Sequence, residues 1–131
     1  MGIERDYLMR QLMMLMEVIQ KIIRFRKQGD HQKAMDEIRY FYDCMKVEGN
    51  LNERTIEELL NLLVNKNKLS NEQLEMVAYV LMEQGELEVS QPQKLDFFRK
   101  AYFLLEKTDR ESTSFSMERQ LKLAELRSYL N

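Results

Sequence analysis

Histidine and cysteine, the residue types most specific to metal centres and nucleophilic sites, are scarce in this sequence. There is one histidine, His31, and one cysteine, Cys44. A metal centre or a nucleophilic site needs several such side chains at defined spacing, and the sequence contains no HExxH, CxxC, P-loop or GxGxxG pattern. His31 follows a residue that suits a helix cap, so a ring partly buried in a turn is the simpler interpretation, and Cys44 is typical of a small core residue. We expect no enzymatic activity, no metal and no cofactor.

Length and composition favour one globular domain covering residues 1–131. The chain has 131 residues, of which 44% are hydrophobic and 32% charged, and its formal net charge is −2. No apolar run approaches the ~18 residues that a membrane-spanning helix needs, so we do not expect an integral membrane protein. The N-terminus carries Glu4 and Asp6 and does not resemble a signal peptide. We therefore expect a cytoplasmic protein.

The stretch from Ile3 to Gln28 has the apolar spacing of one long helix. At about 100° per residue, a central stripe is flanked by apolar side chains on both sides. The central stripe consists of Leu8, Leu12, Leu15, Ile19 and Ile22. Only about a third of the circumference is polar, whereas a surface helix usually needs an apolar stripe of little more than 100°. This helix must be covered from two sides.

Breaks between helical patterns predict two further helices in the first half of the chain. Gly29 and Asp30 separate the long helix from a second one, capped by Asp30, with inner residues that include Met35 and running to about Lys46. Gly49 and Asn50 are expected to close it. Asn52 is expected to cap a third helix, with Leu51 and Ile56 as its hydrophobic staple. This helix should end at a polar turn over residues 65–68.

The second half predicts three more helices. Ser70 and Gln73 form a capping box for a helix that Gly85 should end, followed by a loop over residues 86–90. Ser90 and Gln93 offer a second box, with Pro92 in the first turn, and residues 107–114 form a polar connection. A last helix, about residues 115–130, should bury Met117, Leu121, Ala124, Leu126 and Tyr129. With about six helices and no strand pattern, the fold class is all-α.

Two segments suggest a helical repeat. Lys27–Ala34 and Glu83–Leu87 each resemble the turn between the two helices of a tetratricopeptide repeat, and Phe97–Ala101 resembles its second helix. The match is degenerate, because Phe41 replaces a small residue and residues 88–91 would be an insertion. The resemblance implies a tetratricopeptide-like helical array of antiparallel pairs, with an irregular helix bundle as the alternative.

The two ends of the chain carry a resemblance at the family level. Residues 5–11, 100–106 and 114–120 are similar to segments of a family of small bacterial all-helical proteins that has no assigned activity. The resemblance implies a tetratricopeptide-like fold and no catalytic residues.

These patterns favour a protein–protein interaction or scaffold module. The long first helix has more apolar surface than one neighbouring helix covers, and methionines are adaptable residues at helix-binding surfaces. We expect self-association, as a homodimer, through Met9, Met13, Met16 and Ile23.

A peptide-binding groove is a second hypothesis for the same class of function. The repeat resemblance implies a concave face with Tyr79 exposed for a peptide; a solvated helix face is the alternative. Besides Ile19 and Ile23, its residues would be Arg26, Lys27, Glu75, Tyr79, Met82 and Glu83.

A membrane surface and a nucleic acid are alternative partners. Arg24, Arg26, Lys27 and Lys33 form a basic cluster, but the chain is acidic overall and lacks a groove-reading helix. Asp6 and Glu17 dilute the polar face of the first helix, which has no Trp for a membrane interface.

Overall fold

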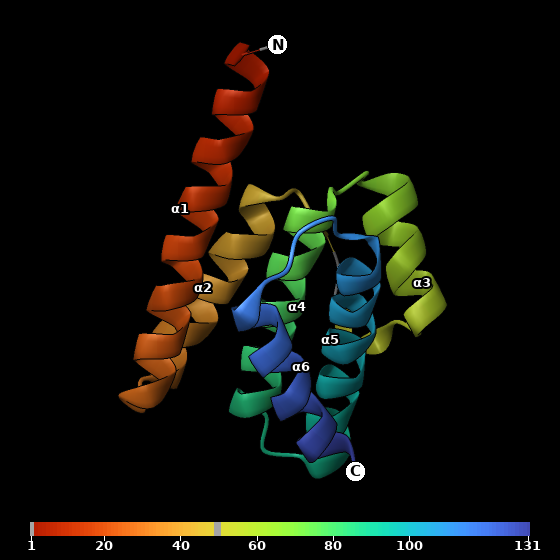
Figure 1. Ribbon diagram of the computed structural model, residues 1–131. Helices are drawn as coiled ribbons and strands as arrows, with labels where there is room; N and C mark the ends of the chain where they lie inside the picture. The colour runs from red at the N-terminus through yellow and green to blue at the C-terminus, as the bar shows by residue number, and fades with distance from the viewer. Residues whose placement is uncertain (1, 49–50) are drawn as a thin grey trace. The chain divides into compact units, whose positions relative to one another are not determined.

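The computed structural model describes residues 2–48 and 51–131, and every regular element in these ranges is a helix (Figure 1). This confirms the all-α prediction. The chain divides into two compact units, Met1–Val47 and Glu48–Asn131, and each is described by itself. That residues 1–131 form a single domain stays a prediction. The elements are α1 Gly2–Lys27, α2 His31–Cys44, η1 Leu51–Glu53, α3 Ile56–Leu60, η2 Asn61–Lys66, α4 Asn71–Leu87, α5 Gln91–Glu111 and α6 Met117–Leu130.

The first unit is an antiparallel pair of helices, α1 and α2. The predicted Asp30 cap is confirmed, since its carboxylate accepts a hydrogen bond from the Lys33 amide at 3.2 Å. Gly29 makes the turn with φ +79°, a conformation that glycine adopts without strain. The pair buries apolar residues from both helices: Leu15, Val18, Ile19 and Ile22 from α1, and Ala34, Ile38 and Phe41 from α2.

Two details of α2 differ from the prediction. The helix ends at Cys44, and Lys46 then adopts a left-handed conformation with φ 56°, so the chain turns before the expected end. Met35 is 41% exposed and is not an inner residue. Gly49 and Asn50, expected to close the helix, lie outside the described residues.

The two helices of this unit differ in length. α1 has 26 residues and α2 has 14, which at 1.5 Å per residue gives about 39 Å and about 21 Å. Because a short turn joins them, α2 returns along the C-terminal half of α1. Figure 1 shows α1 continuing beyond the end of α2. The N-terminal half of α1 therefore has no helix of its own unit beside it.

The second unit begins with short helical pieces. Thr55, and not the predicted Asn52, caps α3, and its hydroxyl and the Glu58 carboxylate form a capping box. The prediction placed the cap too early because residues 51–53 form a separate short turn, η1. The predicted Leu51–Ile56 staple is also wrong, because it assumed the cap at Asn52. A buried lysine, Lys100 of α5, donates to the Leu51 carbonyl at 3.0 Å and contacts Asp96 at 2.6 Å.

Helix α4 begins as predicted and ends later. Ser70 and Gln73 form the expected capping box, with bonds of 2.9 and 3.2 Å. Gly85 does not end the helix, which continues to Leu87. A Cβ at position 85 would lie 2.5 Å from Cε1 of Phe98 on α5, so the glycine permits close packing of two helices instead of making a turn. Residues 83–87 are thus helical, and the connection is residues 88–90.

Helix α5 is longer than expected. Ser90 precedes it without a side-chain capping bond, so the second predicted box is absent, whereas Pro92 lies in the first turn as predicted. The helix continues through the supposed polar connection to Glu111. Ion pairs one turn apart stabilise this end: Lys107 contacts Glu111, and Arg110 contacts Glu106 at 3.0 Å.

Helix α6 packs on α5 with a different face from the predicted one. Ser116 caps it by accepting from the Arg119 amide at 3.2 Å. Leu123 is buried, and so is Leu126 as predicted, whereas Met117 and Leu121 are 61% and 63% exposed. Ala124 and Tyr129, also predicted to be buried, are exposed. The prediction was based on the apolar stripe of α6. In the structure, the face that carries Arg119 is buried instead, and the charge of Arg119 is paired inside the unit.

Candidate functional site

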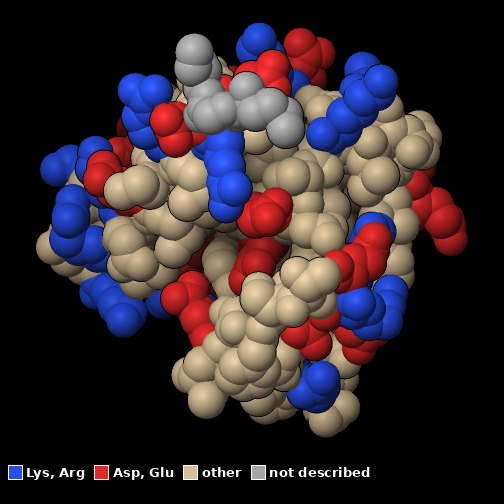
Figure 2. Space-filling view, turned by 45° about the horizontal axis from the view of Figure 1, so that its top comes forward, with Lys and Arg blue, Asp and Glu red and all other residues tan. Residues whose placement is uncertain are grey.

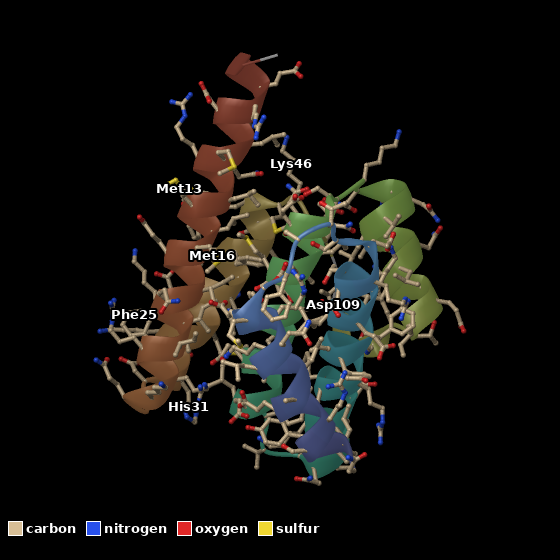
Figure 3. The ribbon with its side chains drawn as sticks, viewed as in Figure 1. Met13, Met16, Phe25, His31, Lys46 and Asp109 are labelled. Carbon is tan, nitrogen blue, oxygen red and sulfur yellow. The ribbon has the colours of Figure 1, made fainter. Side chains whose placement is uncertain are left out.

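The N-terminal half of α1 presents large apolar side chains to solvent. Tyr7 is 64% exposed, Leu8 51%, Met9 52% and Met13 63%. We call Met9, Met13, Met16 and Ile23, the residues predicted for self-association, the methionine face. Its first two members are exposed, and Met16 and Ile23 are half-buried. Figure 3 shows Met13 projecting from the side of α1 that faces away from α2. Exposed methionines one turn apart on a helix, such as Met9 and Met13, are typical of an interaction site.

A groove lies beside this half of α1, on another side of the helix. It has a volume of about 410 Å³ and is lined by Tyr7, Arg10, Gln11, Met14 and Cys44. Cys44 is half-buried at the end of α2, so it is not the fully buried core residue expected. The sequence predicted apolar side chains on both flanks of the central stripe of α1, and Tyr7 and Met14 belong to one flank. Nothing in the pattern placed Cys44 beside them.

Exposed charges of both signs border the methionine face. Arg10, Glu17 and Arg24 recur every seven residues and so lie along one flank of α1, with Asp6 near its N-terminal end. All four side chains are exposed. Figure 2 shows that basic and acidic side chains both occur across the visible face. The methionine face thus has a flank on which positive and negative charges alternate.

A second polar cluster lies inside the second unit. Arg119 is 4% exposed, and its guanidinium donates from Nε to Asp109 at 2.8 Å, from Nη1 to Glu75 at 3.2 Å, and from Nη2 to the Ser114 carbonyl at 2.8 Å. Tyr79 donates to the second oxygen of Glu75 at 2.5 Å. The bond from Arg119 lowers the pKa of Asp109, while burial and the Glu75 bond raise the pKa of Tyr79.

This cluster links three helices and borders a small pocket. Glu75 comes from α4, Asp109 from α5 and Arg119 from α6. The pocket has a volume of about 210 Å³ and is lined by Asn71, Glu72, Glu75, Thr108, Glu111, Ser112, Thr113, Ser114 and Arg119. Because each of the three guanidinium nitrogens donates to a protein group on another element, the arrangement acts as a structural clamp.

The residues of the predicted peptide groove are placed differently from the hypothesis. Tyr79, Met82 and Glu83 are 6%, 3% and 4% exposed, so the expected exposed Tyr79 is wrong. Its ring is directed inward because its hydroxyl bonds Glu75. Arg26 and Lys27 end α1, in the other unit. The peptide groove itself stays a prediction.

His31, the only histidine, occupies the first turn of α2 and is exposed. The partly buried ring expected in this turn is therefore wrong, since the cap leaves that position facing solvent. Figure 3 shows its place beside the α1–α2 turn.

Comparison of the chain with protein-family models, with curated proteins and with solved structures finds no match. The similarity to a bacterial helical family stays a prediction. Over residues 2–48 and 51–131, no helix is long and apolar enough to cross a membrane. The same residues contain no group of three His, Cys, Asp or Glu side chains placed to hold a metal ion.

Proposed function

We propose that this protein is an interaction module that self-associates through the methionine face of α1. The observation that carries the proposal is the exposure of Met9 and Met13, each more than half, on a part of α1 with no helix of its own unit beside it. Burial of an exposed methionine or leucine side chain contributes about 1.5–3 kcal/mol. A partner helix laid along this face would gain that contribution from each of several residues.

The side-chain types support a helical partner. Methionine is unbranched and flexible, so a methionine surface adapts to the shape of an opposing helix. Helix-in-groove and helix-on-helix contacts are anchored by residues three and four positions apart, and Met9, Met13 and Met16 have this spacing.

The flanking charges favour a second copy over an unrelated partner. Arg10 and Glu17 have opposite charges and lie on the same flank of α1. A surface with both signs along one flank is complementary to itself when two copies meet antiparallel, as in an isologous twofold dimer. A uniformly basic flank would instead favour an acidic partner.

Sedimentation equilibrium of the purified chain tests the proposal. We expect a reversible monomer–dimer equilibrium in the wild type. Met9→Glu combined with Met13→Glu should give a monomer, because two carboxylates on the methionine face must be desolvated in the dimer. Both residues are exposed, so circular dichroism should show an unchanged helix content.

The matched control is Met117→Glu combined with Leu121→Glu on α6, whose side chains are 61% and 63% exposed. This variant should dimerise like the wild type. A wild-type chain that stays monomeric at high micromolar concentration would contradict self-association. A dimer that survives the α1 changes would place the interface elsewhere and overturn the proposal.

A further inference from the structure

We propose that two copies pair antiparallel along α1 in a single register, in which Arg10 of each copy faces Glu17 of the partner subunit. The inference rests on the proposed function, because it specifies how the methionine face meets its second copy. It names two specificity-determining residues outside the apolar surface.

The orientation follows from symmetry. In an antiparallel pair with a twofold axis perpendicular to both helices, the same flank of each helix lies on the same side of the contact. The flank with Arg10, Glu17 and Arg24 in one copy therefore meets the same flank in the other. In a parallel dimer, the charged flank of one α1 would meet the opposite flank of the partner's α1. That opposite flank carries Leu12 and Ile19 instead of charges, so no ion pairs would form there.

The register follows from the signs of the charges. When the twofold axis passes beside Met13, Arg10 lies level with the partner's Glu17, and the same ion pair forms again by symmetry. Moving the axis to Arg10 sets Arg10 against the partner's Arg10. Moving it to Glu17 sets two carboxylates against each other. Like charges that face each other repel, so of these three axis positions the one at Met13 combines a methionine centre with two attractive pairs.

The same register also matches the ends of the helix. Asp6 then lies near Lys21 of the partner subunit. It is also within about one helical turn of the partner's Arg24. The exposed side chains of Asp6, Lys21 and Arg24 lie near one another on the α1 circumference. An acidic N-terminal end therefore meets a basic C-terminal part on each side of the axis.

Charge reversal tests the register. Arg10→Glu should turn two attractive pairs into two repulsive ones and raise the dimer dissociation constant about tenfold or more. Glu17→Arg should have the same effect. The double variant Arg10→Glu with Glu17→Arg restores opposite signs in both pairs, and it should dimerise like the wild type.

A mixture of the two single variants gives the sharper measurement. Each variant alone carries like charges at both positions, but a heterodimer of one with the other has two attractive pairs. Native mass spectrometry of an equimolar mixture should therefore show heterodimer in clear excess over either homodimer. Arg39→Glu on α2, where the side chain is exposed, is the charge-matched control and should leave the dissociation constant unchanged.

The outcomes separate the two proposals. A monomeric wild type would overturn self-association itself. A wild-type dimer that the α1 methionine changes dissociate, but whose single variants form no excess heterodimer, would overturn this register and leave the proposed function standing.

Discussion

Arg119 shows how one side chain decides which face of a helix is buried. An apolar pattern alone turns Met117 and Leu121 inward, but the structure exposes both and buries the guanidinium. Burial of a charge is unfavourable unless the charge is paired and hydrogen-bonded. Asp109, Glu75 and the Ser114 carbonyl together provide those partners.

Removal of this guanidinium should destabilise the fold. Arg119→Ala removes the cation with which the carboxylates of Glu75 and Asp109 pair. We expect a loss of about 3 kcal/mol in the free energy of unfolding, at the lower end for a broken buried pair because both carboxylates keep some solvent contact. Urea unfolding measures it. Arg110→Ala, which breaks an exposed pair with Glu106, should cost about 0.5 kcal/mol or less. Equal losses in both variants would contradict the clamp.

Some local side-chain interactions were predictable at this scale, and distant ones were not. The caps at Asp30 and Ser70 join residues three positions apart and were predicted from that spacing, whereas the Ser90–Gln93 box with the same spacing is absent. Glu75 lies 44 residues from Arg119. No spacing rule links positions that only the folded chain brings together, so the Arg119 cluster was missed.

At the scale of whole elements, glycine had two different uses that the sequence does not distinguish. Gly29 makes a turn through a positive φ, as predicted, whereas Gly85 remains in helical conformation beside the Phe98 ring. The number and order of the helices were predicted because apolar periodicity is a local property. The ends of α4 and α5 were not, because packing between helices extends them past Gly85 and Lys107.

The contact at Gly85 gives a prediction with two opposing effects. Gly85→Ala should gain about 1 kcal/mol from helix propensity. The added Cβ, 2.5 Å from a ring carbon of buried Phe98, should cost about 1–3 kcal/mol through overpacking. We therefore expect net destabilisation by about 1 kcal/mol, measured by chemical denaturation.

A double-mutant cycle tests the physical cause. In a Phe98→Leu background the added methyl group has more room, so Gly85→Ala should be neutral or stabilising there. Ala124→Gly at an exposed position of α6 calibrates helix propensity in this protein and should cost about 1 kcal/mol. The same cost of Gly85→Ala in both backgrounds would show that ring contact is not the cause.

At the scale of the whole molecule, the long first helix is the feature that the sequence marked most clearly. Its excess apolar surface follows from composition and period alone. One side is covered by α2, as expected from the Gly29–Asp30 turn. The predicted end of α2, near Lys46, lies two residues beyond the observed end at Cys44. The length of α2 decides how much of α1 has no neighbour in its own unit.

The uneven lengths of α1 and α2 have a consequence for local unfolding. The N-terminal turns of α1 extend beyond the end of α2, so in dilute solution they should open easily. Pairing with a second copy would close them. Amide hydrogen exchange in residues 6–13 should therefore slow as the protein concentration rises, while residues 15–22 should stay protected at every concentration. Mass spectrometry of deuterium uptake at two concentrations measures this, and equal uptake in residues 6–13 would contradict it. In this protein, association of two copies would then stabilise the N-terminal turns of α1 in their folded conformation.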